Sequence, residues 1–178
     1  MGTYTYRSMM MPTMIGFDLT RKFGVELECD ADVHTVQAVA DALTAAGVIC
    51  NVEAYNHNTR RTWKVVSDGS VHGVHPFELV SPPLMGQAGL DEVRRACSAL
   101  NGLGVKVNST CGLHVHHDAH DLDVEAIKRV VGLWWMTEEI VKYMVSPSRR
   151  VNSFARPLHA GSEAPIPGIV QRYRRLLD

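Results

Sequence analysis

The stretch Lys22-Phe-Gly-Val-Glu-Leu-Glu-Cys29 decides the fold, because apolar side chains occupy every second position in it. A period of two is typical of a β-strand, whose successive side chains point to opposite faces of a sheet. One face of this predicted strand carries Phe23, Val25, Leu27 and Cys29. The opposite face carries Gly24, Glu26 and Glu28. A solvated outer face is the simpler explanation of the two glutamates alone, but a strand glycine often marks close approach of a ligand or another backbone.

The remaining elements follow from periodicity and turn residues. Four more strands are predicted over residues 48–54, 61–67, 77–81 and 111–118. Three helices are predicted from apolar stripes at helical spacing. The stripes are Val36, Val39, Ala40 and Leu43; Leu90, Val93, Cys97 and Leu100; and Ile127, Val130, Val131, Trp134, Val141 and Val145.

Turn and helix-breaking residues mark the ends of these helices. Asp32 lies near the start of the first helix and Gly47 just past its end, and Gly102 or Gly104 closes the second. The third begins near Asp123 and must stop before Pro147, so residues 146–168 are expected to form a long loop. The order βαβββαβα predicts an α+β fold, with a mostly antiparallel sheet and helices packed on one face.

Composition indicates a soluble globular protein. The chain has 178 residues, of which 46% are hydrophobic and 21% charged. We expect one domain over residues 21–178, preceded by a flexible leader over residues 1–20 that is neither a signal peptide nor a membrane span. The formal charge of −1 offers no field for nucleic acid or an anionic membrane. Cys29, Cys50 and Cys97 lie in apolar or structured runs and are expected to be small buried side chains, which fits a reducing, cytoplasmic location.

The segment Gly112-Leu-His-Val-His-His-Asp118 alternates polar and apolar residues. One face of this predicted strand carries His114, His116 and Asp118, a pattern suited to metal or phosphate. A zinc-dependent hydrolase of the H-x-H-x-D-H type is an alternative. That motif fails by one position, because residue 119 is alanine and the next histidine is His120.

Further carboxylates occur in two short segments. Asp68-Gly69-Ser70 is a turn, and Glu78 faces away from the apolar side of its strand. The glutamates Glu26, Glu28 and Glu78, together with one or two histidines, form an oxygen-rich set that favours Mg²⁺ or Mn²⁺ over Zn²⁺. Without a cation, three clustered carboxylates would repel one another.

Four motifs, in this order, resemble those of the amidoligases, relatives of glutamine synthetase within the carboxylate–amine ligase superfamily. They are Phe23-Gly-Val-Glu-Leu-Glu28, Trp63-Lys-Val-Val-Ser-Asp-Gly-Ser70, Phe77-Glu-Leu-Val-Ser-Pro-Pro-Leu84 and Asn108-Ser-Thr-Cys-Gly-Leu-His-Val-His116, with a weaker match at Asn152-Ser-Phe-Ala-Arg-Pro157. The resemblance implies a glutamine-synthetase-like fold and an ATP- and Mg²⁺-dependent ligase that joins a carboxylate to an amine through an acyl phosphate.

The resemblance also implies roles for individual residues. The metal ligands would be Glu26, Glu28, Glu78 and His114. His116 would lie near the nucleotide or acyl phosphates, and Asp68 and Ser70 would line the substrate side. Ser81 and Arg156 would contact the nucleotide, phosphate or carboxylate groups.

The family pattern continues past Arg172-Tyr-Arg-Arg-Leu-Leu177 into a further strand with a Glu-x-Arg motif, whereas this sequence stops at Asp178. We therefore expect the N-terminal portion of the family fold, with a homo-oligomer or a partner chain completing the sheet. A binding or structural module that keeps the fold without catalysis, and the metal-dependent hydrolase, remain the alternatives.

Overall fold

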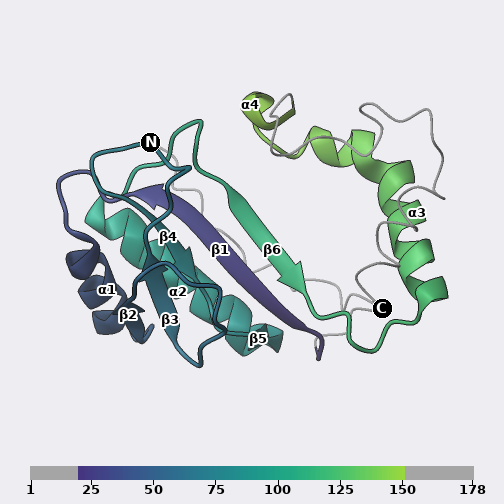
Figure 1. Cartoon of the computed structure of the whole chain (residues 1–178), viewed down its shortest axis with the longest axis horizontal. Helices are drawn as coiled ribbons and strands as arrows, with labels where there is room; N and C mark the ends of the chain where they lie inside the picture. The colour runs from purple at the N-terminus through teal and green to yellow at the C-terminus, as the bar shows by residue number, and fades with distance from the viewer. Residues whose placement is uncertain (1–19, 151–178) are drawn as a thin grey trace, which may run out of the picture. The chain divides into compact units, whose positions relative to one another are not determined.

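The computed structural model describes residues 20–150, which divide between two compact units, residues 1–118 and 119–178 (Figure 1). The first unit contains β1 (Lys22–Asp30), α1 (Val36–Ala45), β2 (Cys50–Val52), β3 (Trp63–Val66), β4 (Pro76–Val80), β5 (Leu84–Met85), α2 (Gly86–Leu103) and β6 (Leu113–His117). The second contains α3 (Val124–Lys142) and α4 (Pro147–Arg150). The predicted elements are thus present, in the predicted order, and the fold is α+β as expected.

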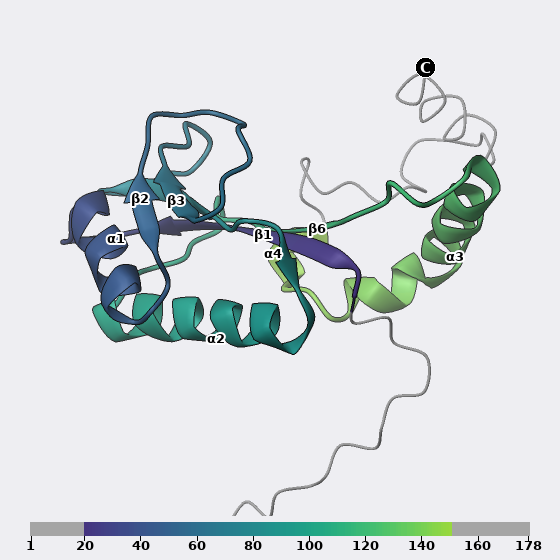
Figure 2. The same ribbon diagram turned by 90° about the horizontal axis from the view of Figure 1, so that it is seen from below.

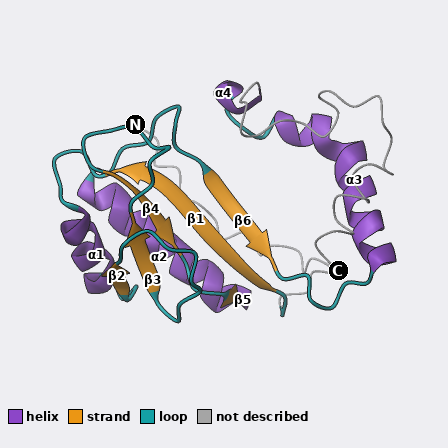
Figure 3. Cartoon of the chain, viewed as in Figure 1, coloured by secondary structure: helices purple, strands orange, loops and turns teal. Residues whose placement is uncertain are grey.

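Strand β1 pairs with three other strands of the sheet, whose order is β2-β3-β4-β1-β5 with β6 also paired to β1 (Figure 3). Leu27 pairs with Leu79 of β4 and with Leu113 of β6, so these two strands occupy opposite edges of β1. Every pairing is antiparallel except β2 with β3, which is parallel. The prediction of a mostly antiparallel sheet is confirmed.

A bulge separates β4 from β5, a two-residue strand that the sequence did not predict. Val25 pairs with Ser81 through the backbone, whereas two residues earlier Phe23 pairs with Leu84. Two residues, Pro82 and Pro83, therefore lie opposite the single residue Gly24 of β1, as in a β-bulge. Prolines suit this position because they have no backbone N–H to donate to the sheet. The chain resumes pairing after the prolines instead of leaving the sheet.

Helices α1 and α2 cover one face of the sheet (Figure 2). Their apolar side chains form the core together with Trp63, Phe77 and Leu79, which are fully buried. The Trp63 indole Nε1 donates to Glu92 Oε1 on α2 at 2.6 Å, which fixes the helix across β3. Thr35 caps the start of α1, in place of the Asp32 suggested by the sequence, and Gly104 closes α2 in the left-handed conformation with φ 77°.

The buried stripe of α2 differs from the predicted one. Leu100 is buried as predicted and Val93 packs against the core, but Leu90 and Cys97 are exposed, and Gly89 and Ala96 are buried instead. A Cβ at position 89 would lie 2.9 Å from Leu84 Cβ, so the helix approaches the sheet through small side chains. Apolarity alone could not reveal this, because the close approach depends on the sheet beneath.

Three other expectations need correction. The expected buried thiol of Cys97 is exposed, as its position on α2 requires, while Cys111 is buried. Strand β2 is shorter than the predicted range 48–54. Residues 147–150 form a helical turn within the expected long loop, since Pro147 suits the first position of a helix.

In the second unit, α3 begins after Asp123, whose side chain accepts from Ala126 N, and ends before Pro147 as predicted. Val130, Trp134 and Val145 of its predicted stripe are exposed. No helix in the described part of the chain is long and apolar enough to span a membrane. The residues assigned to the leader, apart from Thr20, and Arg156 lie outside the described residues.

Candidate cation site

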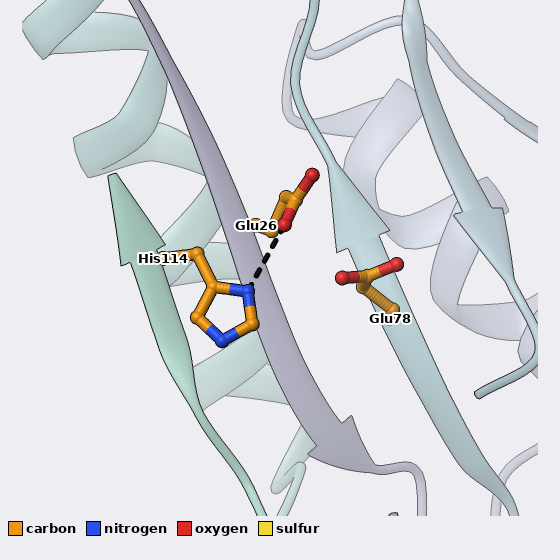
Figure 4. A group of neighbouring side chains, drawn as sticks. All are labelled: Glu26, Glu78 and His114. Atoms are coloured by element: carbon orange, nitrogen blue, oxygen red, sulfur yellow. Dashed lines mark hydrogen bonds and ion pairs between the residues drawn. The ribbon is translucent and has the colours of Figure 1, made fainter. Parts of the chain in front are cut away.

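Three neighbouring strands bring the predicted ligands to one face of the sheet. Antiparallel register places Glu28 of β1 opposite Glu78 of β4, and Glu26 of β1 opposite His114 of β6. Residues directly opposite in a sheet project from the same face. Figure 4 shows Glu26, Glu78 and His114 lying together above the three strands. The faces predicted strand by strand therefore combine into one, and this is the face of the sheet that α1 and α2 do not cover.

Two of the three histidines of β6, His114 and His116, contact the Glu26 carboxylate. His114 Nδ1 lies 3.0 Å and His116 Nε2 3.2 Å from Glu26 Oε2. Burial alone would raise the pKa of Glu26, but the hydrogen bonds from His114 and His116 outweigh it and hold that pKa below its usual value. Glu26 is therefore an ionised carboxylate at neutral pH, oriented by two imidazoles.

Glu28 is the most buried carboxylate of the group. It is 8% exposed, and its Oε2 accepts from the backbone N–H of Gly112 at 2.6 Å. Its other oxygen, Oε1, lies 3.7 Å from His114 Nε2. A Cβ at Gly112 would lie 3.0 Å from Glu28 Oε2 and 3.1 Å from His114 Nε2. The absence of a side chain at Gly112 therefore allows Glu28 and His114 to approach each other.

Glu78 lies among like charges. Burial and the nearby carboxylates of Glu26, Asp68 and Glu28 raise its pKa to about 7, although His114 acts in the opposite direction. Like charges directly opposite in a sheet are destabilising, and Glu28 and Glu78 are such a pair. A cation between them would remove this cost.

Asp68 joins the group from the loop between β3 and β4. Its Oδ1 accepts from both the backbone N–H and the hydroxyl of Ser70, each at 2.7 Å, which orients the carboxylate. Potential ligand atoms of Glu28, Asp68 and Glu78 all lie within 4.8 Å of one another, and so do those of Glu26, Glu78 and His114. Glu78 is common to both groups, so the arrangement offers two adjoining cation positions.

Ser81, Ser70 and Gly24 are further residues that the sequence suggested for the site. The Ser81 hydroxyl accepts from Val25 N at 2.8 Å and donates to Pro82 O at 2.8 Å, so it has protein partners at the bulge. The Ser70 hydroxyl is engaged by Asp68. At Gly24 an added Cβ would meet His116 and Ser81 only at 3.8 Å, so no neighbouring protein atom demands a glycine there.

The residues of the hydrolase alternative do not assemble into a ligand group. Among residues 20–150, neither His116 nor Asp118 belongs to any group of three potential metal ligands. The ligand atoms that do converge are four carboxylates and one imidazole, and this set suits Mg²⁺ or Mn²⁺.

Two residues of this face were not singled out from the sequence. Gly112 supplies its backbone N–H to Glu28, and the only signal is its position at the start of the Gly-x-His-x-His run. Lys64 is 3% exposed, and its Nζ donates to Asn56 O, Asn56 Oδ1 and Asn58 O, each at 2.9 Å. Its register opposite Val80 places it on the same face as Glu78, and the alternation with Trp63 and Val65 could have indicated this. Lys64 therefore holds the β2–β3 loop on the site side of the sheet (Figure 2).

No curated protein and no solved structure shows significant similarity to this chain. The family model described as "Putative amidoligase enzyme" matches residues 19–163, which include every described residue of the candidate site. Because this match spans well over half of the 178 residues, the chain belongs to that amidoligase family.

Proposed function

We propose that the protein is an ATP- and divalent-cation-dependent ligase that joins a carboxylate to an amine. The observation that carries this proposal is the pair of adjoining ligand groups that share Glu78 on one sheet face. Carboxylates packed this closely repel one another unless cations lie between them, and an oxygen-rich cation site of this kind suits nucleotide phosphates. Family membership supports ligation as the reaction class.

The chain's own residues would divide the work as follows. Glu26, Glu78 and His114 would hold one cation, and Glu28, Asp68 and Glu78 a second. When bound, the cations would neutralise phosphate oxygens and help to hold the transferring phosphoryl group in line. Gly112 N–H keeps Glu28 directed toward the ligand groups, and Ser70 does the same for Asp68.

His116 is the best-placed residue of the site for contact with substrate phosphates. Its side chain is 62% exposed, and it already contacts Glu26. An imidazole held against a carboxylate can donate a hydrogen bond to a phosphate oxygen. We propose that Ser81 and Arg156 also serve the nucleotide or carboxylate, and that Asp68 borders the substrate side as well as a cation.

The proposed reaction has two steps. A carboxylate oxygen attacks the γ-phosphorus of ATP, forming an acyl phosphate as the bond to ADP breaks. The amine nitrogen then attacks the acyl carbon, an amide bond forms, inorganic phosphate leaves, and the amine proton passes to solvent or to a nearby carboxylate. ATP becomes ADP and phosphate, and no oxidant or reductant is needed.

Two measurements on the purified chain test this proposal. Calorimetry with Mg²⁺-ATP should show binding, and ADP release should depend on added acid and amine. Glu26→Gln and Glu78→Gln should abolish cation-dependent binding, whereas Glu125→Gln should not, because Glu125 is an exposed residue of α3 paired with Lys128. Binding without ADP release would favour the non-catalytic module, and Zn²⁺-dependent hydrolysis without nucleotide would favour the hydrolase.

A further inference from the structure

A closed ring of hydrogen bonds joins the loop that carries Asp68 to the loop that precedes β6. His72 N–H donates to Thr110 Oγ1 at 3.0 Å, and the Thr110 hydroxyl donates to Asn108 Oδ1 at 2.6 Å. The Asn108 amide Nδ2 then donates to His72 O at 2.8 Å, closing the ring. Asn108 Oδ1 also accepts from Thr110 N at 2.8 Å. Each donor and acceptor has one consistent role, so the ring specifies one arrangement of the two loops.

Both loops joined by this ring also carry groups of the candidate cation site. Thr110 is two residues before Gly112, whose N–H binds the Glu28 carboxylate. On the other loop, His72 follows Val71, which is 3% exposed, and Ser70, which holds Asp68. The ring therefore spans the two segments that approach Glu28 from opposite edges of β1.

We infer that Asn108 and Thr110 are positioning residues for the cation group formed by Glu28, Asp68 and Glu78. The inference rests on the proposed function, because it concerns the same site. Asn108 is exposed, and in the ring its side-chain amide binds only polar groups of the two loops, so it contributes little to the core. The ring sets the distance between the Asp68 loop and the Gly112 N–H. Groups that orient metal ligands in this way commonly change metal affinity about 10- to 100-fold when removed.

The inference is tested by measuring, with calorimetry, the affinity of the full chain for Mn²⁺ alone. Thr110→Val keeps the shape of the side chain but removes the hydroxyl from the ring, so we expect affinity to fall about 10-fold or more. Thr110→Ser retains the hydroxyl and should stay close to wild type. Thr62→Val is the matched control, because it likewise removes a threonine hydroxyl that is bonded to an asparagine side chain, here as acceptor from Asn51 Nδ2 of β2, outside the ring.

Thermal unfolding separates positioning from folding. We expect Thr110→Val and Asn108→Ser to weaken Mn²⁺ binding while the melting temperatures stay near that of wild type. Unchanged Mn²⁺ affinity in both variants overturns the inference and leaves the proposed function standing. A loss of affinity that only follows a large fall in melting temperature also overturns it, because the ring would then be a fold element. No Mn²⁺ binding by wild type overturns the proposed function and this inference together.

Discussion

Glu78 is the residue that both candidate ligand groups share, and its protonation links cation binding to pH. Burial and neighbouring carboxylates raise its pKa to about 7 in the metal-free chain. A raised carboxyl pKa means that the folded chain favours the protonated form. The associated stability is present below the ordinary value of 4.5 and is lost as the pH rises through about 7.

We predict that Mg²⁺ affinity rises between about pH 6 and pH 8, since the cation must displace the Glu78 proton less often at higher pH. Calorimetry across this range measures the affinity. A pH-independent Mg²⁺ affinity would contradict this assignment.

In the metal-free chain, Glu78→Gln should raise the free energy of unfolding near pH 8 by on the order of 1–2 kcal/mol, after allowance for solvent screening. It should leave the free energy of unfolding near pH 4 unchanged within roughly 0.5 kcal/mol.

Gly112 matters because of the side chain that it lacks. An added Cβ would crowd Glu28 Oε2 at 3.0 Å and His114 Nε2 at 3.1 Å. We predict that Gly112→Ala weakens Mn²⁺ binding about 10-fold by separating these ligands, with the fold retained. Gly102→Ala is the control, because no atom lies within 4 Å of the added Cβ, and in a helix it should stabilise by about 0.5–1 kcal/mol. Equal Mn²⁺ affinity in the two variants would show that the Gly112 contact does not orient ligands.

At the scale of elements, the connection between β3 and β4 is shaped by Asp30 at the end of β1. The buried Asp30 carboxylate accepts three backbone N–H groups, from Asp32, Val74 and His75, at 2.8 to 3.1 Å. Burial raises the pKa of Asp30, but these hydrogen bonds outweigh it and lower the pKa below its usual value. The corresponding stability is present above the ordinary pKa of 3.8 and is lost as the pH falls below it.

We predict that Gly73→Ala destabilises this connection. An added Cβ would lie 2.3 Å from Asp30 Cγ and Oδ2, so either the carboxylate or the loop must move. The expected cost is about 2–4 kcal/mol in the free energy of unfolding, measured by urea denaturation. Gly69→Ala in the same loop is the control, because nothing lies within 4 Å of its added Cβ. A Gly73→Ala chain as stable as wild type would mean that the loop relaxes freely around Asp30.

At the scale of the whole molecule, β6 presents the least covered part of the sheet. Within residues 20–150 it pairs with β1 alone, and all five of its residues are exposed. Leu113 and Val115 project from the apolar face and are 65% and 52% exposed. An apolar edge strand of this kind is prone to pair with another chain. We propose that a second copy of this chain, or a partner chain, covers β6.

The expected outcome is a concentration-dependent oligomer in light scattering of the purified protein. Val115→Lys should weaken that association, because a charge would be buried at the new contact. Val33→Lys is the matched control, since Val33 is 79% exposed and lies outside β6. A monomer at all concentrations would rule out self-association through β6, and a partner supplied by another polypeptide would then remain to be sought.

The sequence by itself determined which side chains share a strand face. Alternation is local: a residue's neighbours at i and i+2 fix the face on which Glu26, Glu28, His114 and His116 lie, whatever else the chain does. The same argument identified the core face of β1, while capping residues indicated the end of α2 at Gly104 and the start of α3 after Asp123. Four short motifs in order were enough to indicate the family.

Only the tertiary structure decided the distances between those faces. Register places Glu28 opposite Glu78 and brings Gly112 N–H to Glu28 Oε2, although Gly112 is 84 positions from Glu28 in the sequence. The position of Asp68 depends on a loop held by Asp30 and Asn108. Which residues of α2 are buried depends on how closely the helix packs against the sheet at Gly89. These features arise from contacts between distant segments, and periodicity carries no information about such contacts.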